Sequence, residues 1–279
     1  MSNTLKTTAL FALLVMILGI FISCTPANQG NGTEGEGTGN VDNSDQGDTG
    51  DQVEIPADTD KYIATMTTTF TTDDADMADI IAHMGESVTV VSTDGSAIKI
   101  HGESQVGMSS SENEYVYIDG IIYSYTRVNV DGKTASSYEK AAMSAEDSDA
   151  LIKKAGPGAS IGSGDFMTKE RSKEGNITTY VCSNMSSASR DSLAGIFAKR
   201  FAGYNATVRL VSATYNLELI GDANKSSDLS CDFIVTMNGT DYSFTMNLKC
   251  EYEYTSEVSI TAPENADKYE ETSLEKIIG

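Results

Sequence analysis

The chain has 279 residues and a formal net charge of −22 at pH 7, which is the first constraint on its function. DNA, RNA and anionic lipid surfaces bind proteins through basic patches, and no segment of this sequence concentrates Lys and Arg. We therefore expect no nucleic-acid partner and no direct docking on anionic headgroups.

The N-terminal segment has the organisation of an export signal. Lys6 precedes an apolar stretch, Ala9–Ile22, that is shorter than the roughly 20 residues of a membrane-spanning helix. Phe21-Ile22-Ser23 and the following Cys24 resemble a bacterial lipobox, with Phe in place of the usual Leu. We expect residues 1–23 to be a lipoprotein signal peptide and Cys24 to carry the lipid that anchors the protein on the extracytoplasmic face of the cell membrane. An ordinary cleaved signal peptide or an uncleaved anchor is the alternative.

The next segment, residues 24–60, is rich in Gly, Asn, Thr and Ser, contains nine acidic residues and has no Lys, Arg or aromatic residue. Such a composition cannot bury a core and repels itself, so we expect an acidic disordered tether that lifts a domain off the membrane. The remaining residues 61–279 are numerous enough to enclose a hydrophobic core, and we expect them to form a single antiparallel α+β domain.

Four dipeptides in this domain lie between runs of β-branched and aromatic residues. They are Asp94-Gly95, Asp119-Gly120, Asp131-Gly132 and Asn238-Gly239. Each combines residues that tolerate the positive φ angles of a two-residue type I′ turn. The four together predict an antiparallel meander.

A two-residue loop at Asn238-Gly239 would pair Met237 with Thr240 and separate the hairpin into one dry and one wet face. The dry face would hold Cys231, Phe233, Val235, Met237, Tyr242, Phe244, Met246, Leu248 and Cys250. The hairpin at Asp119-Gly120 is apolar or aromatic on both faces. Its tyrosines are therefore expected either to pack beneath a loop or helix, or to meet a ligand or partner.

Apolar residues at helical spacing predict two to three short helices. The predicted helices are Ser189–Phe201, Ser144–Ala155 and Met77–Met84. In the second, Ser144 and Asp147 have the spacing of a capping box. Short helices against a large antiparallel sheet make an α+β domain.

The overall layout resembles the LolA/LppX-like envelope lipoproteins over most of residues 61–270. The resemblance rests on the lipobox-like Phe21–Cys24, the acidic tether, strand pairs such as Glu114–Val128, one amphipathic helix, and a closing strand, Glu257–Thr261, that runs into Ala262–Ala266. It implies a half-barrel, in which a large curved antiparallel sheet packs on two to three short helices. It also implies a non-enzymatic protein that holds a lipid or other apolar ligand in the concavity of its sheet, and it assigns no functional residue.

Residues suited to catalysis or metal binding are scarce. The two histidines, His83 and His101, lack metal-ligand spacing, and the glycine-rich stretch Gly156–Gly164 lacks the Lys-Ser/Thr of a phosphate loop. We expect no enzyme, no metal and no cofactor. Once Cys24 is lipidated, three cysteines remain, and we expect them to be free and buried: Cys182, Cys231 and Cys250.

Two functions remain open. The first is a carrier whose cavity lies between the dry face of the hairpin and the helix near residue 197. The residues expected to line that cavity are Leu193, Phe197, Phe201, Phe233, Val235, Tyr242, Phe244 and Met246. The second is a surface-displayed protein-interaction or sensory module with a fully packed core. Its exposed patch would hold tyrosines, especially Tyr115, Tyr117, Tyr123 and Tyr125, and its partner is unknown.

Overall fold

The computed structural model describes residues 54–82, 84–106, 109–144, 147, 161–201 and 205–278. The predicted signal peptide, Cys24, most of the predicted tether, and His83 therefore lie outside the described residues. The first strand begins at Lys61, which is the predicted start of the domain.

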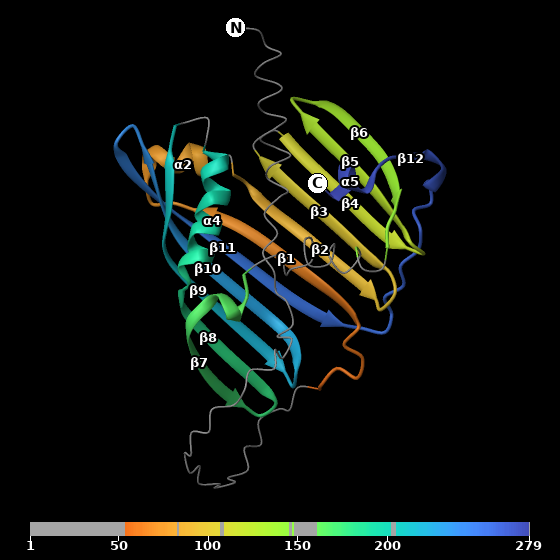
Figure 1. Cartoon of the computed structure of the whole chain (residues 1–279), viewed down its shortest axis with the longest axis horizontal. Helices are drawn as coiled ribbons and strands as arrows, with labels where there is room; N and C mark the ends of the chain where they lie inside the picture. The colour runs from red at the N-terminus through yellow and green to blue at the C-terminus, as the bar shows by residue number, and fades with distance from the viewer. Residues whose placement is uncertain are drawn as a thin grey trace.

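Within these ranges the chain forms a 12-stranded sheet and three short α-helices (Figure 1). The strands are β1 (Lys61–Thr71), β2 (Glu86–Asp94), β3 (Ile98–Val106), β4 (Ser109–Ile118), β5 (Ile121–Val130), β6 (Lys133–Ala142), β7 (Phe166–Glu174), β8 (Ile177–Met185), β9 (Thr207–Ile220), β10 (Ala223–Met237), β11 (Thr240–Tyr254) and β12 (Glu270–Glu271). The helices are α2 (Ala75–Ala82), α4 (Ser187–Arg200) and α5 (Leu274–Ile278), with 3₁₀ turns η1 (Ser163–Asp165) and η3 (Ala266–Lys268).

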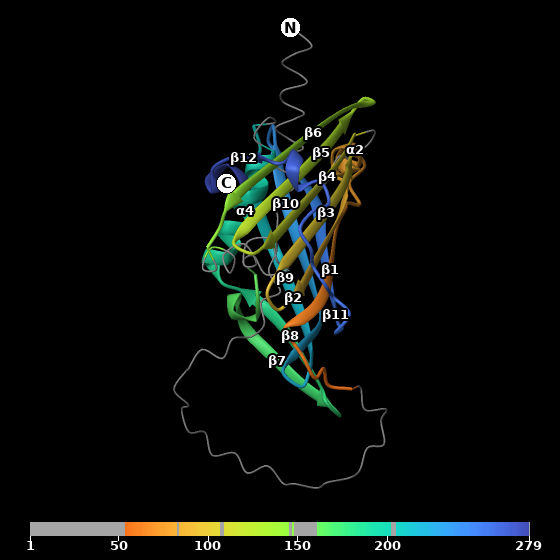
Figure 2. The ribbon, with the colours of Figure 1, turned by 90° about the vertical axis from the view of Figure 1, so that its right-hand side faces the viewer.

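The strand order is β12-β6-β5-β4-β3-β2-β1-β11-β10-β9-β8-β7. Two meanders, β1 to β6 and β7 to β11, are joined where β1 pairs with β11. Neighbouring strands pair antiparallel, apart from the short β12, which runs parallel to β6. The result is a large, open, curved sheet of half-barrel type (Figures 1 and 2), and the predicted α+β class is confirmed.

Three of the four predicted turns are confirmed, because both central residues of Asp119-Gly120, Asp131-Gly132 and Asn238-Gly239 have positive φ. The prediction was wrong at Asp94-Gly95. Here the last paired residues are Thr93 and Ile98, so the loop is longer than two residues. The Asp94 carboxylate accepts hydrogen bonds from the backbone N–H groups of Ser96 and Ala97, at 3.0 and 2.8 Å, and this side-chain-closed turn replaces the type I′ turn.

Two predicted helices are confirmed, with small shifts of their ends. Helix α4 begins two residues earlier than predicted because the Ser186 hydroxyl accepts a hydrogen bond from the Ser189 N–H and caps the first turn. Ser144 and Asp147 form the predicted reciprocal pair of capping bonds. The rest of the predicted helix Ser144–Ala155 lies outside the described residues.

One face of the sheet, which we call the helix face, carries α4 and α5 (Figure 2). Its largest cluster of buried residues packs β9, β10 and β11 against α4 and α2. A second cluster on the same face packs β1 to β6 against α5, through Leu274 and Ile277. The dry and wet faces predicted for the β10–β11 hairpin are confirmed, since Met237 pairs with Thr240 and Phe233 with Phe244.

The opposite face, which we call the outer face, is covered in part by residues 255–278, which we call the strap. Val258 and Ile260 of the strap pack on Val116 and Tyr123 of the outer face. The strap then passes the edge of the sheet as β12, and α5 returns to the helix face. The prediction of a closing strand at Glu257–Thr261 was wrong. This part of the strap is irregular and lies across the sheet instead of pairing with a strand.

Candidate functional site

The residues predicted to line an apolar cavity come together on the helix face, between α4 and strands β10 and β11. Phe197 is fully buried, and the centroid of its ring lies 4.5 Å from the ring centroid of Phe233 and 5.5 Å from that of Phe244. Leu193, Phe201, Val235 and Met246 are buried in the same cluster, and the half-buried Tyr242 packs against it. These side chains therefore fill the space between helix and sheet with one another.

Among the hollows in the described part of the chain, four open on other surfaces of the protein. One of them touches Phe233 and Phe244, but its other lining residues come from the wet face of the hairpin, such as Asp232 and Thr245, and from residues 71–73 and Val211. Two more are lined mainly by charged and hydroxyl side chains. None of the four is lined by residues of α4, so within the described part of the chain they provide no apolar chamber beneath that helix.

The tyrosines of the β4–β5 hairpin divide between the two faces of the sheet. Tyr117 is buried and Tyr115 half-buried on the helix face, where they belong to the cluster that contacts α5. Tyr123 and Tyr125 are half-buried on the outer face. The four predicted patch residues therefore do not form one surface, because alternate residues of a strand point to opposite sides.

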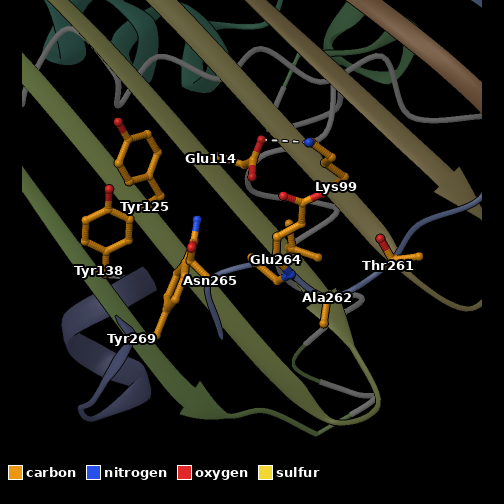
Figure 3. Close-up of a pocket in the computed structure, with 11 residues that line it drawn as sticks. Lys99, Glu114, Tyr125, Tyr138, Thr261, Ala262, Glu264, Asn265 and Tyr269 are labelled. Carbon is orange, nitrogen blue, oxygen red and sulfur yellow. Dashed lines mark ion pairs between the residues drawn. The ribbon is translucent and has the colours of Figure 1, made fainter. Parts of the chain in front are cut away.

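The fourth hollow is a groove of about 380 Å³ on the outer face, which we call the tyrosine groove (Figure 3). Its floor is a row across three neighbouring strands, in which Glu114 pairs with Tyr125 and Tyr125 with Tyr138. Lys99 of β3 lies beside this row. Because paired residues of adjacent antiparallel strands share a face, this register places the four side chains on the same side of the sheet.

The strap supplies the other wall of the groove, with residues 261–265 and Tyr269. Tyr269 is buried, and its ring packs edge-on against Tyr138, at 5.4 Å and 82°, and against Tyr123, at 5.3 Å and 89°. Tyr125 and Tyr138 lie side by side at 5.0 Å with an interplanar angle of 38° (Figure 3). Aromatic rings in these arrangements attract one another, so Tyr269 fixes the strap against the floor of the groove.

The groove contains charges of both signs. Lys99 Nζ lies 2.7 Å from Glu114 Oε2, and His101 Nδ1 lies 3.8 Å from the same oxygen. Glu264 of the strap is exposed at the rim. Burial raises the pKa of Tyr269 to about 12, and the nearby Glu114 carboxylate adds to this shift. The phenol of Tyr269 therefore stays protonated at neutral pH and remains a hydrogen-bond donor.

No group of three or more His, Cys, Asp and Glu side chains in the described residues is arranged to hold a metal ion. His101 lies within β3, with Nε2 3.0 Å from Glu103 Oε1. The predicted free, buried state of Cys182, Cys231 and Cys250 is confirmed. Ser227, and not Cys231, is the residue opposite Cys250, as the two-residue loop requires.

A motif associated with serine hydrolases is present in the sequence. Gly158-Ala159-Ser160-Ile161-Gly162 has the Gly-x-Ser-x-Gly spacing of the nucleophile turn in those enzymes. In such enzymes the serine stands on a turn that leads into a helix. Here Gly158, Ala159 and Ser160 lie outside the described residues, and Ile161 and Gly162 lead through the single turn η1 into strand β7. The pentapeptide thus lacks the helix that follows a nucleophile turn.

Sequence reasoning missed most of the tyrosine groove. Of its lining residues the sequence pattern indicated only Tyr125 as a functional candidate, and not Tyr138, Tyr269 or the Lys99–Glu114 pair. Tyr125 and Tyr138 flank the Asp131-Gly132 turn at equal distances, so the predicted two-residue loop could have paired them. No local signal places Tyr269 beside them, since that contact depends on the path of the strap.

Comparisons with known proteins add little. No protein-family model matches the chain, and no curated protein matches it. Two solved structures that align with it are an isomerase-inactive variant of GphF DH1 and the dehydratase domain of the polyketide PpsC from Mycobacterium tuberculosis. The first is 7% identical and covers 74% of this chain and 79% of its own; the second is 11% identical and covers 71% and 77%. Both have a TM-score of 0.13, which is too low to carry an argument about fold or function.

The helices in the described part of the chain are all too short or too polar to cross a membrane.

Proposed function

We propose that this protein is a lipid-anchored, extracytoplasmic and non-enzymatic interaction or sensory module with a fully packed core. The observation that carries this proposal is the burial of Phe197, whose ring contacts Phe233 and Phe244 at the place where a carrier would need a cavity. A ligand of acyl-chain size could enter there only if several core side chains moved, and close-packed interiors resist such changes.

The tyrosine groove gives the proposed module a binding surface. It lies on the outer face, away from the core, and it combines half-buried aromatic rings with charged and amide groups. Aromatic side chains that are partly exposed beside polar groups are typical of recognition sites. The lipobox-like Phe21–Cys24 supports the anchor, and the acidic segment after it supports display at a distance from the membrane.

Native mass spectrometry of residues 55–279, purified from a bacterial host, tests the proposed function. We expect the mass of the polypeptide alone and no uptake of added phospholipid. A phospholipid, glycolipid or quinone that co-purifies in stoichiometric amount would overturn the packed-core proposal. It would favour instead the apolar-ligand carrier, with the α4 and hairpin residues as its lining.

The anchor is tested separately with the full chain. A bacterial host is grown with radiolabelled palmitate, and the protein is isolated from membranes. We expect label in the wild-type protein and none in Cys24→Ala, with the second protein accumulating as an unprocessed or soluble form. Equal labelling of both proteins, or no labelling of either, would refute lipidation at Cys24.

A further inference from the structure

The tyrosine groove offers ring faces and hydrogen-bonding groups side by side. The ring centroids of Tyr125 and Tyr138 lie 5.0 Å apart and the rings are tilted by 38°, so the two phenols form one aromatic patch on the outer face of the sheet. Both are half-buried, and both line the groove. The face of an aromatic ring carries partial negative charge and therefore attracts C–H groups that carry partial positive charge.

Donors and acceptors surround this aromatic surface. Lys99 and Asn265 supply N–H donors, Glu114 and Glu264 supply carboxylate acceptors, and Thr261 supplies a hydroxyl that can do both. Glu264, Asn265 and Thr261 are exposed on the strap, so a ligand can reach them without a rearrangement of the core. Figure 3 shows the side chain of Asn265 extending from the strap towards the rings of Tyr125 and Tyr138.

The mixture of groups decides among classes of ligand. A purely apolar ligand would displace water from Lys99, Glu114 and Asn265 without replacing the hydrogen bonds of that water, at a cost of about 1–3 kcal/mol for each group left unsatisfied. A compact organic cation would profit from the aromatic rings. However, the Glu114 carboxylate, which lies opposite Tyr125 in the sheet, is already paired with Lys99 at 2.7 Å, so another cation would have to compete with the Lys99 ammonium for it. A neutral ligand with alternating C–H and hydroxyl groups meets neither objection.

We propose that the tyrosine groove binds a neutral oligosaccharide, with the C–H faces of its sugar rings packed on Tyr125 and Tyr138. The hydroxyl groups of the sugar then bond to Lys99, Glu264 and Asn265. A volume of about 380 Å³ lies within the roughly 300–1,000 Å³ of typical ligand sites. This inference rests on the proposed function, because it names the ligand class that the module recognises.

The test uses the full-length protein in detergent on an array of neutral oligosaccharides, followed by calorimetry with the strongest binder. We expect at least one neutral oligosaccharide to bind. Tyr125→Ala and Tyr138→Ala should each weaken its binding by about tenfold or more, because each removes a stacking surface. Tyr138→Phe should bind within about threefold of wild type, since it keeps the ring. Glu264→Gln and Asn265→Ala, both at exposed positions, should weaken binding without affecting the fold.

The matched control is Tyr180→Ala, because Tyr180 is a half-buried tyrosine of β8 whose ring packs against the helix-face cluster. It should not change sugar binding. Failure of every neutral oligosaccharide to bind would overturn the inference, and so would sugar binding that is unchanged in the groove variants. Tyrosine-dependent binding of tetramethylammonium or of a peptide in place of any sugar would overturn it too. None of these results would refute the packed core or the lipid anchor of the proposed function, which have separate tests.

Discussion

Asp94 Oδ2 accepts a hydrogen bond from the backbone N–H of Ile260 at 3.3 Å, and this bond joins the β2–β3 turn to the strap 166 residues later in the chain. The other oxygen of the same carboxylate closes its own turn, through Ser96 and Ala97. Ile260 itself is buried against Val116. One carboxylate therefore holds both a tight turn and the segment that walls the tyrosine groove.

Asp94→Ala should lower the free energy of unfolding at pH 7 by about 1–3 kcal/mol, because it leaves several N–H donors unpaired. Burial by itself would raise the pKa of Asp94, but the hydrogen bonds from Ala97, Ser96 and Ile260 outweigh it and lower the pKa to about 2. The contribution of the carboxylate is thus complete above pH 4 and is lost as the pH falls towards 2.

Urea unfolding of wild type and Asp94→Ala at pH 7 and at pH 2 measures this difference. The gap between the two proteins should narrow at the lower pH. Asp131→Asn serves as the control. Asp131 is an exposed turn residue with positive φ, a conformation that Asn adopts as readily as Asp, so this substitution should cost little stability at either pH. An equal gap at both pH values would contradict the role assigned to the ionised carboxylate.

Phe197→Ala should lower the free energy of unfolding by about 3–5 kcal/mol, because it opens a cavity among rings that now touch. Val211→Ala, at a position that is 42% exposed, should change stability by no more than about 0.5 kcal/mol. Chemical denaturation of the two variants gives both values. If Phe197→Ala retains wild-type stability and changes lipid uptake instead, the packed core of the proposed function is wrong.

Two glycine substitutions should act in opposite directions. Gly239 has a φ of +81° and open space where a Cβ would stand, so Gly239→Ala should cost about 1–2 kcal/mol from backbone strain alone. Gly195 lies in α4, exposed and with open space around it, and Gly195→Ala should stabilise the protein by about 0.5–1 kcal/mol. Thermal unfolding measures both, and shifts of the same sign would contradict the assigned conformations.

The three thiols of the domain should not react with iodoacetamide at pH 8 in the native protein. Burial raises the pKa of Cys231 to about 12, with a further contribution from Asp232, and burial also raises the pKa of Cys182. A thiol that stays protonated is a poor nucleophile. Mass spectrometry of Cys24→Ala should find no modified cysteine before denaturation and three afterwards. Fast labelling of native Cys231 would show that its site opens more readily than its burial indicates.

The sequence predicted local structure well at most of the positions where a short-range rule applied. A two-residue loop fixes the register of its hairpin, and so the pairing of Cys250 with Ser227 followed from Asn238-Gly239 alone. The same dipeptide rule failed at Asp94-Gly95, because the Asp94 side chain bonds Ser96 and Ala97 and makes a longer turn favourable. The dipeptide alone does not reveal whether the two-residue turn or the longer turn closed by the Asp94 side chain forms.

Long-range features could not be predicted in the same way. Val258 and Ile260 alternate with polar residues as in a strand, but they pack on the outer face because strands β3 to β5 already have their neighbours. The residues of the predicted cavity were correctly placed together, yet their spacing could not show that α4 lies close enough to bring Phe197 and Phe233 into contact. The tyrosine groove depends on the first of these relations, since the strap forms one of its walls.

The pairing of β1 with β11 sets the order in which the domain can be completed. These two strands lie near opposite ends of the described sequence, yet they are neighbours in the middle of the sheet. During synthesis each meander can form its own hairpins early, but β1 keeps one unpaired edge until β11 has been made. We expect slow folding that depends on this late, distant contact. Until it forms, the nascent domain presents an exposed strand edge that invites association with other chains.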